Sequence, residues 1–178
     1  MWKILFTILF AALPLPAAGA QQAPSIDAHQ VCAREFGDYF KLDPKFPPMT
    51  ADLDNDGHPD LVLVATSRNP LAGEGDFHYR TVDPYDAYFG WGDPKVTVQF
   101  SATSATQPRY VLVVHNWQSP KAKFVIINLP FDRLTLARVA RKKKAQDSIH
   151  AIETGGLASD VYWDGHKYKW QPSYIDNE

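Results

Sequence analysis

Four aspartates at short intervals are the residues whose types and spacing most clearly predict chemistry. They occupy positions 1, 3, 5 and 9 of the segment 52–60 and are Asp52, Asp54, Asp56 and Asp60. Calcium takes about six to eight oxygen ligands at roughly 2.3–2.6 Å in flexible geometry. The carboxylates converge only if the chain turns tightly, and Gly57 permits this because glycine adopts positive φ without steric cost. The spacing predicts a Ca²⁺ loop, with the His58 backbone carbonyl and water completing the ligands.

An EF-hand does not fit this segment, because it needs a glutamate at position 12 and flanking helices. Position 12 is Leu63, within an apolar run. A last aspartate at position 9 that opens such a run resembles the calcium loop of FG-GAP and VCBS-type repeats in integrin-like β-propellers, over the residues 50–64. The alternative is an acidic surface turn without an ion, but four close carboxylates repel one another unless a cation neutralises them.

The acidic run occurs only once in the sequence. A propeller has at least four blades, and one loop cannot supply them. The ligand-binding face of a propeller is therefore not expected in this chain. The chain as a whole resembles exported bacterial proteins that carry a single VCBS-like calcium segment. The stretches that carry this resemblance are 31–48, 83–96, 122–131 and 162–170. The resemblance implies export and calcium, and no particular activity.

The first 20 residues are typical of a secretory signal peptide. Lys3 supplies the positive charge, residues 4–13 are apolar, and Ala18-Gly19-Ala20 fits a cleavage site. The apolar run is shorter than the roughly 20 residues that a membrane-spanning helix needs. We therefore expect no membrane span and one globular domain, residues 21–178, in the periplasm or outside the cell. With Cys32 as the only cysteine, no internal disulfide can form, and a structural ion is a natural substitute.

Several enzyme and partner classes have no support in the sequence. The formal net charge of −2 gives no general attraction to nucleic acid. HExxH, GxSxG and GxxxxGK motifs are absent. One enzyme hypothesis stays open, a calcium-supported hydrolase of envelope or extracellular polysaccharide, which needs two carboxylates across a cleft. The candidates are Glu74, Asp76, Asp83, Asp86 and Asp93.

Two further segments are candidate contact surfaces for a protein or glycan partner. Tyr85, Tyr88 and Trp91 lie in an aromatic stretch, and such side chains serve as rigid anchors at interfaces. The alternative is a loop that packs these rings onto the core. A basic cluster could contact an anionic polymer or form a solvated turn; its members are Arg138, Arg141, Lys142, Lys143 and Lys144.

The hydrophobic pattern predicts an α+β fold that is mainly β. Residues 26–42 show helical periodicity, with Asp27 as an N-cap. Strands are expected at 60–66, 96–100, 110–115 and 123–129, and a hairpin at 161–170 around the turn Asp164-Gly165. For 131–153 we expect a short helical turn followed by strands around 136–141 and 148–153. Together these elements predict an antiparallel sheet with one N-terminal helix packed on it and a calcium loop leading into a core strand.

The sequence thus predicts a secreted or periplasmic calcium-binding domain in which Ca²⁺ is structural. Its other surfaces would contact a protein or glycan partner. The polysaccharide hydrolase is the alternative.

Overall fold

The computed structural model describes residues 26–90, 109–141 and 144–173. Its helices are α1 (Ala28–Phe36), the 3-10 helix η1 (Gly37–Tyr39), α2 (Glu74–Phe77) and α3 (Pro84–Tyr88). Its strands are β1 (Lys41–Leu42), β2 (Met49–Ala51), β3 (Asp60–Thr66), β4 (Arg80–Val82), β5 (Arg109–His115), β6 (Ala122–Ile126), β7 (Arg133–Arg141), β8 (Lys144–Ile152), β9 (Ala158–Trp163) and β10 (Tyr168–Ser173). The expected signal peptide, residues 1–20, and the expected strand 96–100 lie outside the described residues. No helix in the described ranges is long and apolar enough to span a membrane.

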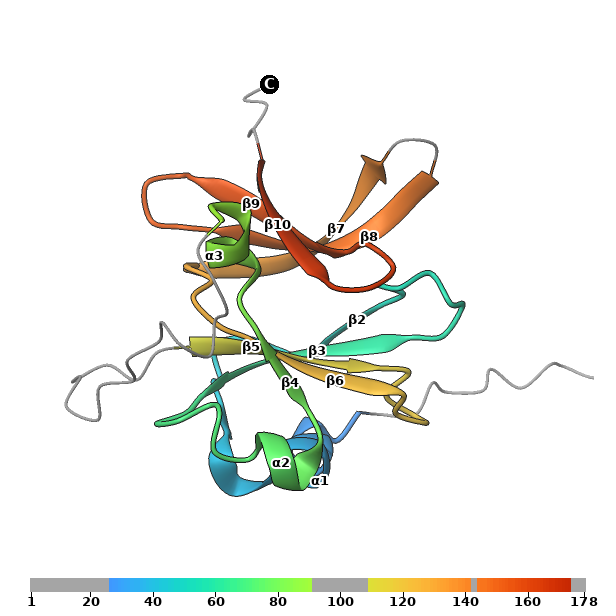
Figure 1. Cartoon of the computed structure of the whole chain (residues 1–178), viewed down its shortest axis with the longest axis vertical. Coiled ribbons are helices and arrows are strands. Elements are labelled where there is room, and N and C mark those ends of the chain that lie inside the picture. The colour runs from blue at the N-terminus through green and yellow to red at the C-terminus, as the bar shows by residue number, and fades with distance from the viewer. Residues whose placement is uncertain (1–25, 91–108, 142–143, 174–178) are drawn as a thin grey trace, which may run out of the picture.

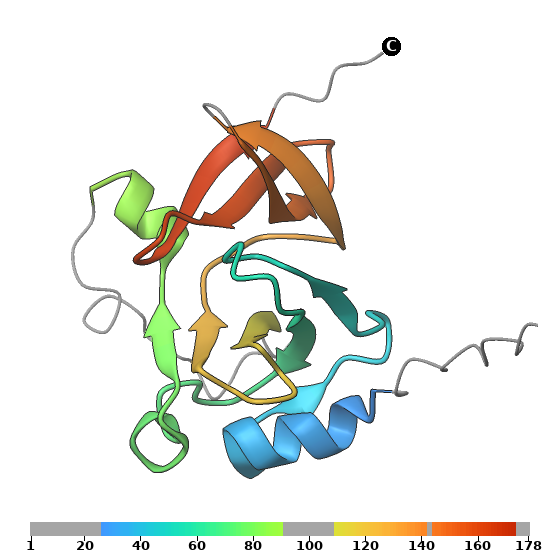
Figure 2. The same ribbon diagram turned by 90° about the vertical axis from the view of Figure 1, so that its right-hand side faces the viewer.

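The described strands form two sheets. The N-terminal sheet has the order β1-β3-β5-β6-β4, with β2 also paired to β3, and the C-terminal sheet has the order β10-β9-β8-β7. The C-terminal sheet covers one side of the N-terminal sheet, and helix α1 covers the other (Figures 1 and 2). The predicted class, α+β and mainly β with one N-terminal helix, is confirmed. The division into two sheets and the parallel pair β4–β6 were not predicted.

Strand β3 is apolar along its length because both of its faces are covered. Leu61 and Leu63 pack in a cluster with residues of α1. Val62 and Val64 pack in a second cluster, which includes residues of the C-terminal sheet. A strand buried on both faces reads as a continuous apolar run rather than an alternating one. Strand β3 therefore lies in the middle layer. Leu53, in the loop before β3, packs in the cluster between the two sheets.

Helix α1 is shorter than the predicted 26–42. The side chain of Asp27 accepts a hydrogen bond from the backbone N–H of Gln30 at 3.0 Å, as expected for an N-cap. The helix ends at Phe36 because Gly37 adopts φ 67° and leaves the helical path. A Cβ at Gly37 would lie 2.4 Å from ring atoms of Phe77, so a larger residue does not fit there.

Two predictions for the C-terminal half need correction. The helical turn expected after residue 131 is absent, because residues 133–141 and 144–152 pair as one antiparallel hairpin. There Leu134 is buried and Leu136 partly so, which is the period of two of a strand. The predicted hairpin around Asp164-Gly165 exists, but four residues separate the paired Trp163 and Tyr168. The Asp164 carboxylate accepts two backbone N–H groups of that turn at 2.9 Å.

Candidate metal centre

The four aspartates lie around one hairpin loop. Strands β2 and β3 pair Ala51 with Asp60, so residues 52–59 connect two antiparallel neighbours. We call residues 52–60 the acidic loop. Its turn is formed by Asn55 and Gly57, whose φ angles are 57° and 85°. Positive φ is easily adopted by glycine and tolerated by asparagine, so these residue types suit the turn that the chain makes.

The carboxylates of the acidic loop point inward and organise its backbone. Asp52 accepts the N–H groups of Asp56 and Gly57, each at 3.0 Å. Asp54 also accepts the N–H of Asp56, at 3.1 Å. Asp56 in turn accepts the N–H of His58 at 2.8 Å. His58, expected to offer its carbonyl, is an exposed member of the same loop.

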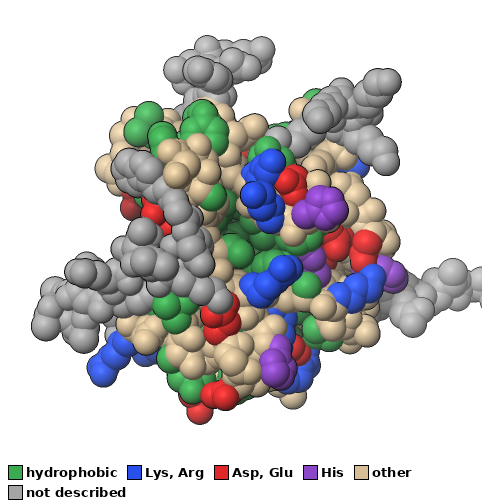
Figure 3. All heavy atoms as spheres, in the orientation of Figure 1, with side chains coloured by type: hydrophobic (Ala, Val, Ile, Leu, Met, Phe, Trp, Pro, Cys, Tyr) green, Lys and Arg blue, Asp and Glu red, His purple; other side chains and the backbone are tan. Residues whose placement is uncertain are grey.

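Asp52, Asp54 and Asp56 form an outer group, in which one oxygen from each carboxylate lies within 4.8 Å of the others. Two unit charges 4.8 Å apart repel by about 0.9 kcal/mol in bulk water and about 3.5 kcal/mol at an effective dielectric constant of about 20, and closer charges repel more strongly. Lys121 offsets part of this charge, since its Nζ lies 2.5 Å from Asp56 Oδ2. The contact with Lys121 is the main cause that lowers the pKa of Asp56. On the right-hand side of Figure 3, where Figure 1 places the loop between β2 and β3, acidic side chains lie beside basic and histidine side chains.

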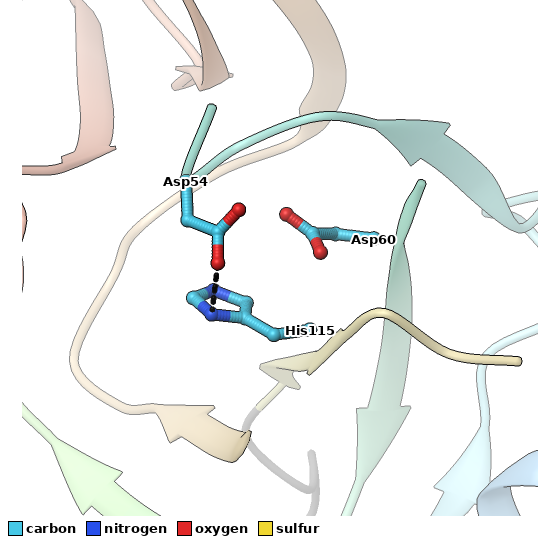
Figure 4. A group of neighbouring side chains, drawn as sticks. All are labelled: Asp54, Asp60 and His115. Atoms are coloured by element: carbon cyan, nitrogen blue, oxygen red, sulfur yellow. Dashed lines mark ion pairs between the residues drawn. The ribbon is translucent and has the colours of Figure 1, made fainter. Parts of the chain in front are cut away.

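Asp54 also belongs to an inner group, together with Asp60 and His115. The Asp54 and Asp60 carboxylates face each other above the His115 ring (Figure 4). His115 Nδ1 lies 3.3 Å from Asp54 Oδ2, and its Nε2 is hydrogen-bonded to the Tyr168 hydroxyl at 2.6 Å. Burial lowers the pKa of His115 below its ordinary value, although the Asp54 charge acts in the opposite direction. A neutral imidazole is therefore favoured here.

Asp60 is fully buried at the start of β3. Its two oxygens accept the backbone N–H groups of Leu53 and Asn116, each at 2.8 Å. Burial, with a smaller contribution from the charges of Asp54 and Asp52, raises the pKa of Asp60 to about 6 despite these two donors. A cation among these oxygens would favour the ionised carboxylate. Each oxygen of the buried carboxylate thus has a backbone donor, and the Asp54 carboxylate lies close to it.

The acidic loop is anchored to the core by Leu53 and Gln146. The Leu53 side chain is fully buried and packs in the cluster between the sheets. Gln146 Nε2, on β8, donates to the Leu53 carbonyl at 3.1 Å and to the Trp163 carbonyl at 2.5 Å. The sequence pattern alone did not indicate these anchors. His115 follows an apolar run and extends the β3–β5 register beside Asp60, a signal visible only once that pairing is known.

The donor set fits a hard cation such as calcium. Carboxylate oxygens are hard ligands that calcium prefers, and oxygens on opposite sides of a calcium ion lie about 4.6–5.2 Å apart, twice the ligand distance. The outer oxygens, within 4.8 Å of one another, can surround an ion of that size. Asp52, Asp54 and Asp56 would hold it, whereas Asp60 lies with Asp54 and His115 in the inner group.

The predicted aromatic contact surface is only partly exposed and is not flat. Tyr88 is 53% exposed and Phe89 50% exposed, whereas Tyr85 is half-buried, and all three rings contact Trp170. The planes of Tyr85 and Tyr88 lie at 83° and 67° to that of Trp170, so these rings do not form a flat platform. Trp91 lies outside the described residues.

Two described carboxylates of the hydrolase hypothesis, those of Glu74 and Asp83, have structural partners. Glu74 accepts the backbone N–H of Thr81 at 3.0 Å. Asp83 caps α3 by accepting the N–H of Asp86 at 2.8 Å, and it also accepts Asn128 Nδ2 at 2.5 Å. Burial, with the nearby Asp86 carboxylate, raises the pKa of Asp83. These hydrogen bonds give the Glu74 and Asp83 carboxylates a structural role that needs no substrate.

Asp76 accepts the Tyr39 hydroxyl at 3.4 Å, and Asp93 lies outside the described residues. In the basic cluster, Arg138 is exposed and pairs with Asp147 at 3.4 Å. Lys142 and Lys143 lie outside the described residues. None of these contacts indicates an anion-binding or catalytic site.

The structure brings Asp52, Asp54 and Asp56 together in the outer group, and Asp54 together with Asp60 and His115 in the inner group. Lys121 pairs with Asp56 of the outer group. Of the predicted aromatic surface it describes only Tyr85 and Tyr88. Comparison of the chain with protein-family models, with curated proteins and with solved structures found no match. The assignment of the acidic loop therefore rests on its own sequence and geometry.

Proposed function

We propose that this protein is an exported calcium-binding domain in which the ion is structural, while other surfaces contact a protein or glycan partner. The observation that carries the proposal is the outer group of Asp52, Asp54 and Asp56, three carboxylates that converge inside one tight hairpin loop. The resemblance of residues 50–64 to FG-GAP and VCBS-type loops supports the same ion. The signal-like residues 1–20 support export.

A structural role suits the position of the loop. It opens directly into β3, the strand covered on both faces, and its Leu53 and Asp60 are fully buried. A cation there would neutralise close carboxylates at the entrance to the core. Extracellular calcium modules have dissociation constants of about 10⁻⁴–10⁻³ M, so about 1 mM calcium would stabilise the fold by roughly 0.4–1.4 kcal/mol. That is a useful fraction of a total of about 5–15 kcal/mol.

Calcium titration by calorimetry and thermal melting tests the proposal. We expect wild-type protein to release or absorb heat on binding, and its melting temperature to rise by about 1–6 °C in 1 mM calcium relative to chelator. Asp54→Asn should lose both effects, because Asp54 belongs to both groups of possible ligands. Asp147→Asn, which removes a carboxylate from the C-terminal sheet, is the matched control and should keep them. Wild-type protein that shows neither heat nor a melting shift would contradict the proposal.

A further inference from the structure

The acidic loop is held from the C-terminal sheet as well as from its own sheet. Gln146 on β8 donates one hydrogen bond to the carbonyl of Leu53 and another to the carbonyl of Trp163 on β9. Leu53 stands between two of the predicted ligands, Asp52 and Asp54. Its carbonyl is therefore fixed relative to the C-terminal sheet by a single side chain.

A second connection runs through His115. One ring nitrogen lies 3.3 Å from Asp54 Oδ2, and the other is hydrogen-bonded to the hydroxyl of Tyr168 on β10. The imidazole is enclosed by aromatic rings, with centroids 5.1 Å away at Phe124 and Trp163 and 5.8 Å away at Tyr168. This packing leaves the ring little freedom to rotate. The position of the Asp54 carboxylate is thus linked to Tyr168 through His115.

We propose that His115 and Gln146 are positioning residues for the cation site, an inference that rests on the proposed function. They hold the acidic loop against the C-terminal sheet, so the ligands are arranged for the ion only when the two sheets are packed together. A loop that is already ordered loses less conformational entropy on binding than a free one. By thermodynamic linkage, cation binding must then strengthen the packing of the sheets by the same factor.

Two substitutions that nearly preserve side-chain volume test this connection, each with a control on the same strand. Tyr168→Phe removes only the hydroxyl that bonds His115, and Gln146→Leu removes both donors of Gln146. Ser173→Ala on β10 and Ser148→Ala on β8 remove hydroxyls that bond Asp160 and the Ala137 carbonyl instead. The controls therefore alter the same strands without touching the acidic loop.

The readout is the calcium dissociation constant, measured by calorimetry well below each melting temperature. A residue that merely stabilises the fold does not change the affinity of the folded protein. We expect Tyr168→Phe and Gln146→Leu each to raise Kd by about twofold to tenfold, the equivalent of one hydrogen bond. The calcium-induced melting shift should shrink in these two variants, while both serine variants keep the wild-type Kd.

The outcomes separate this inference from the function on which it rests. Wild-type protein that fails to bind calcium overturns the proposed function and the inference together. Wild-type protein that binds calcium, with an unchanged Kd in Tyr168→Phe and Gln146→Leu, overturns the positioning role alone. A rise in Kd in the serine variants equal to that in their partners also overturns it, because the effect would then belong to the strands and not to the connecting side chains.

Discussion

Leu53→Ala is the substitution that best tests how the acidic loop is attached. Side chains of hairpin loops are commonly exposed, but that of Leu53 is fully buried between the two sheets, among Val62, Ile149 and Val161. Truncation to alanine removes buried methyl groups and leaves a cavity that the two sheets can only partly close. The backbone N–H and carbonyl of residue 53 keep their partners, so the substitution acts on packing.

The expected cost is large for a loop residue. Buried leucine-to-alanine changes cost about 2–5 kcal/mol, and each kcal/mol shifts the melting temperature of a protein of this size by about 2–4 °C. We therefore expect Leu53→Ala to melt about 4–20 °C below wild type. Calcium at 1 mM, with roughly 0.4–1.4 kcal/mol of stabilisation, is too weak to restore the loss.

Thermal melting and urea unfolding, each with and without calcium, measure this effect. Leu157→Ala is the matched control, because Leu157 lies in a turn of the C-terminal sheet with 68% of its surface exposed and should change stability by less than about 0.5 kcal/mol. A Leu53→Ala variant as stable as Leu157→Ala would refute the conclusion that the loop is anchored in the core between the sheets.

Three further predictions concern single charged or reactive groups. Lys121→Met should lower the calcium Kd measured by calorimetry by up to about fivefold, because the ion then no longer competes with the exposed Lys121–Asp56 ion pair. Lys169→Met makes the same change of charge away from the acidic loop and should leave Kd unchanged. Although burial opposes the shift, two backbone N–H groups and Lys169 hold the pKa of Asp164 at about 2. Wild type should therefore lose stability as pH falls from about 4 towards 2, and Asp164→Asn should lose less in urea unfolding at those pH values. Burial raises the pKa of the Cys32 thiol to about 11, so a thiol reagent at pH 8 should modify it only after denaturation; rapid modification of native protein would contradict this.

The local pattern of the sequence was enough to predict strand β3 and the acidic loop before it. Glycine after three alternating carboxylates and an apolar run after the fourth are signals contained in fifteen residues, so no distant contact is needed to read them. The strand 60–66 has the predicted bounds. The side chains of Asp52, Asp54 and Asp56 converge because the hairpin that joins them is itself local.

The second sheet and the anchors of the loop depend on contacts between distant segments. The apolar side chains of residues 131–153 fit either a short helix or a strand, so pairing with neighbouring strands decides their conformation. His115 and Gln146 approach the loop only because β5 lies beside β3 and because the C-terminal sheet lies across both. Nothing in the spacing of a lone histidine or glutamine indicates such a partner. Tertiary packing therefore determined what local propensity left open.

The strand order of the N-terminal sheet has a consequence for the sequence of events in folding. Strand β4 pairs only with β6 in the described sheet. During synthesis from the N-terminus, β4 therefore has no partner strand until β6 has been made. The acidic loop can close early, since its ends are neighbours, but the hydrogen bond from Gln146 to Leu53 spans 93 residues. Such distant contacts form late and slowly. We therefore expect the loop to close before the hydrogen bond from Gln146 can hold it against the C-terminal sheet.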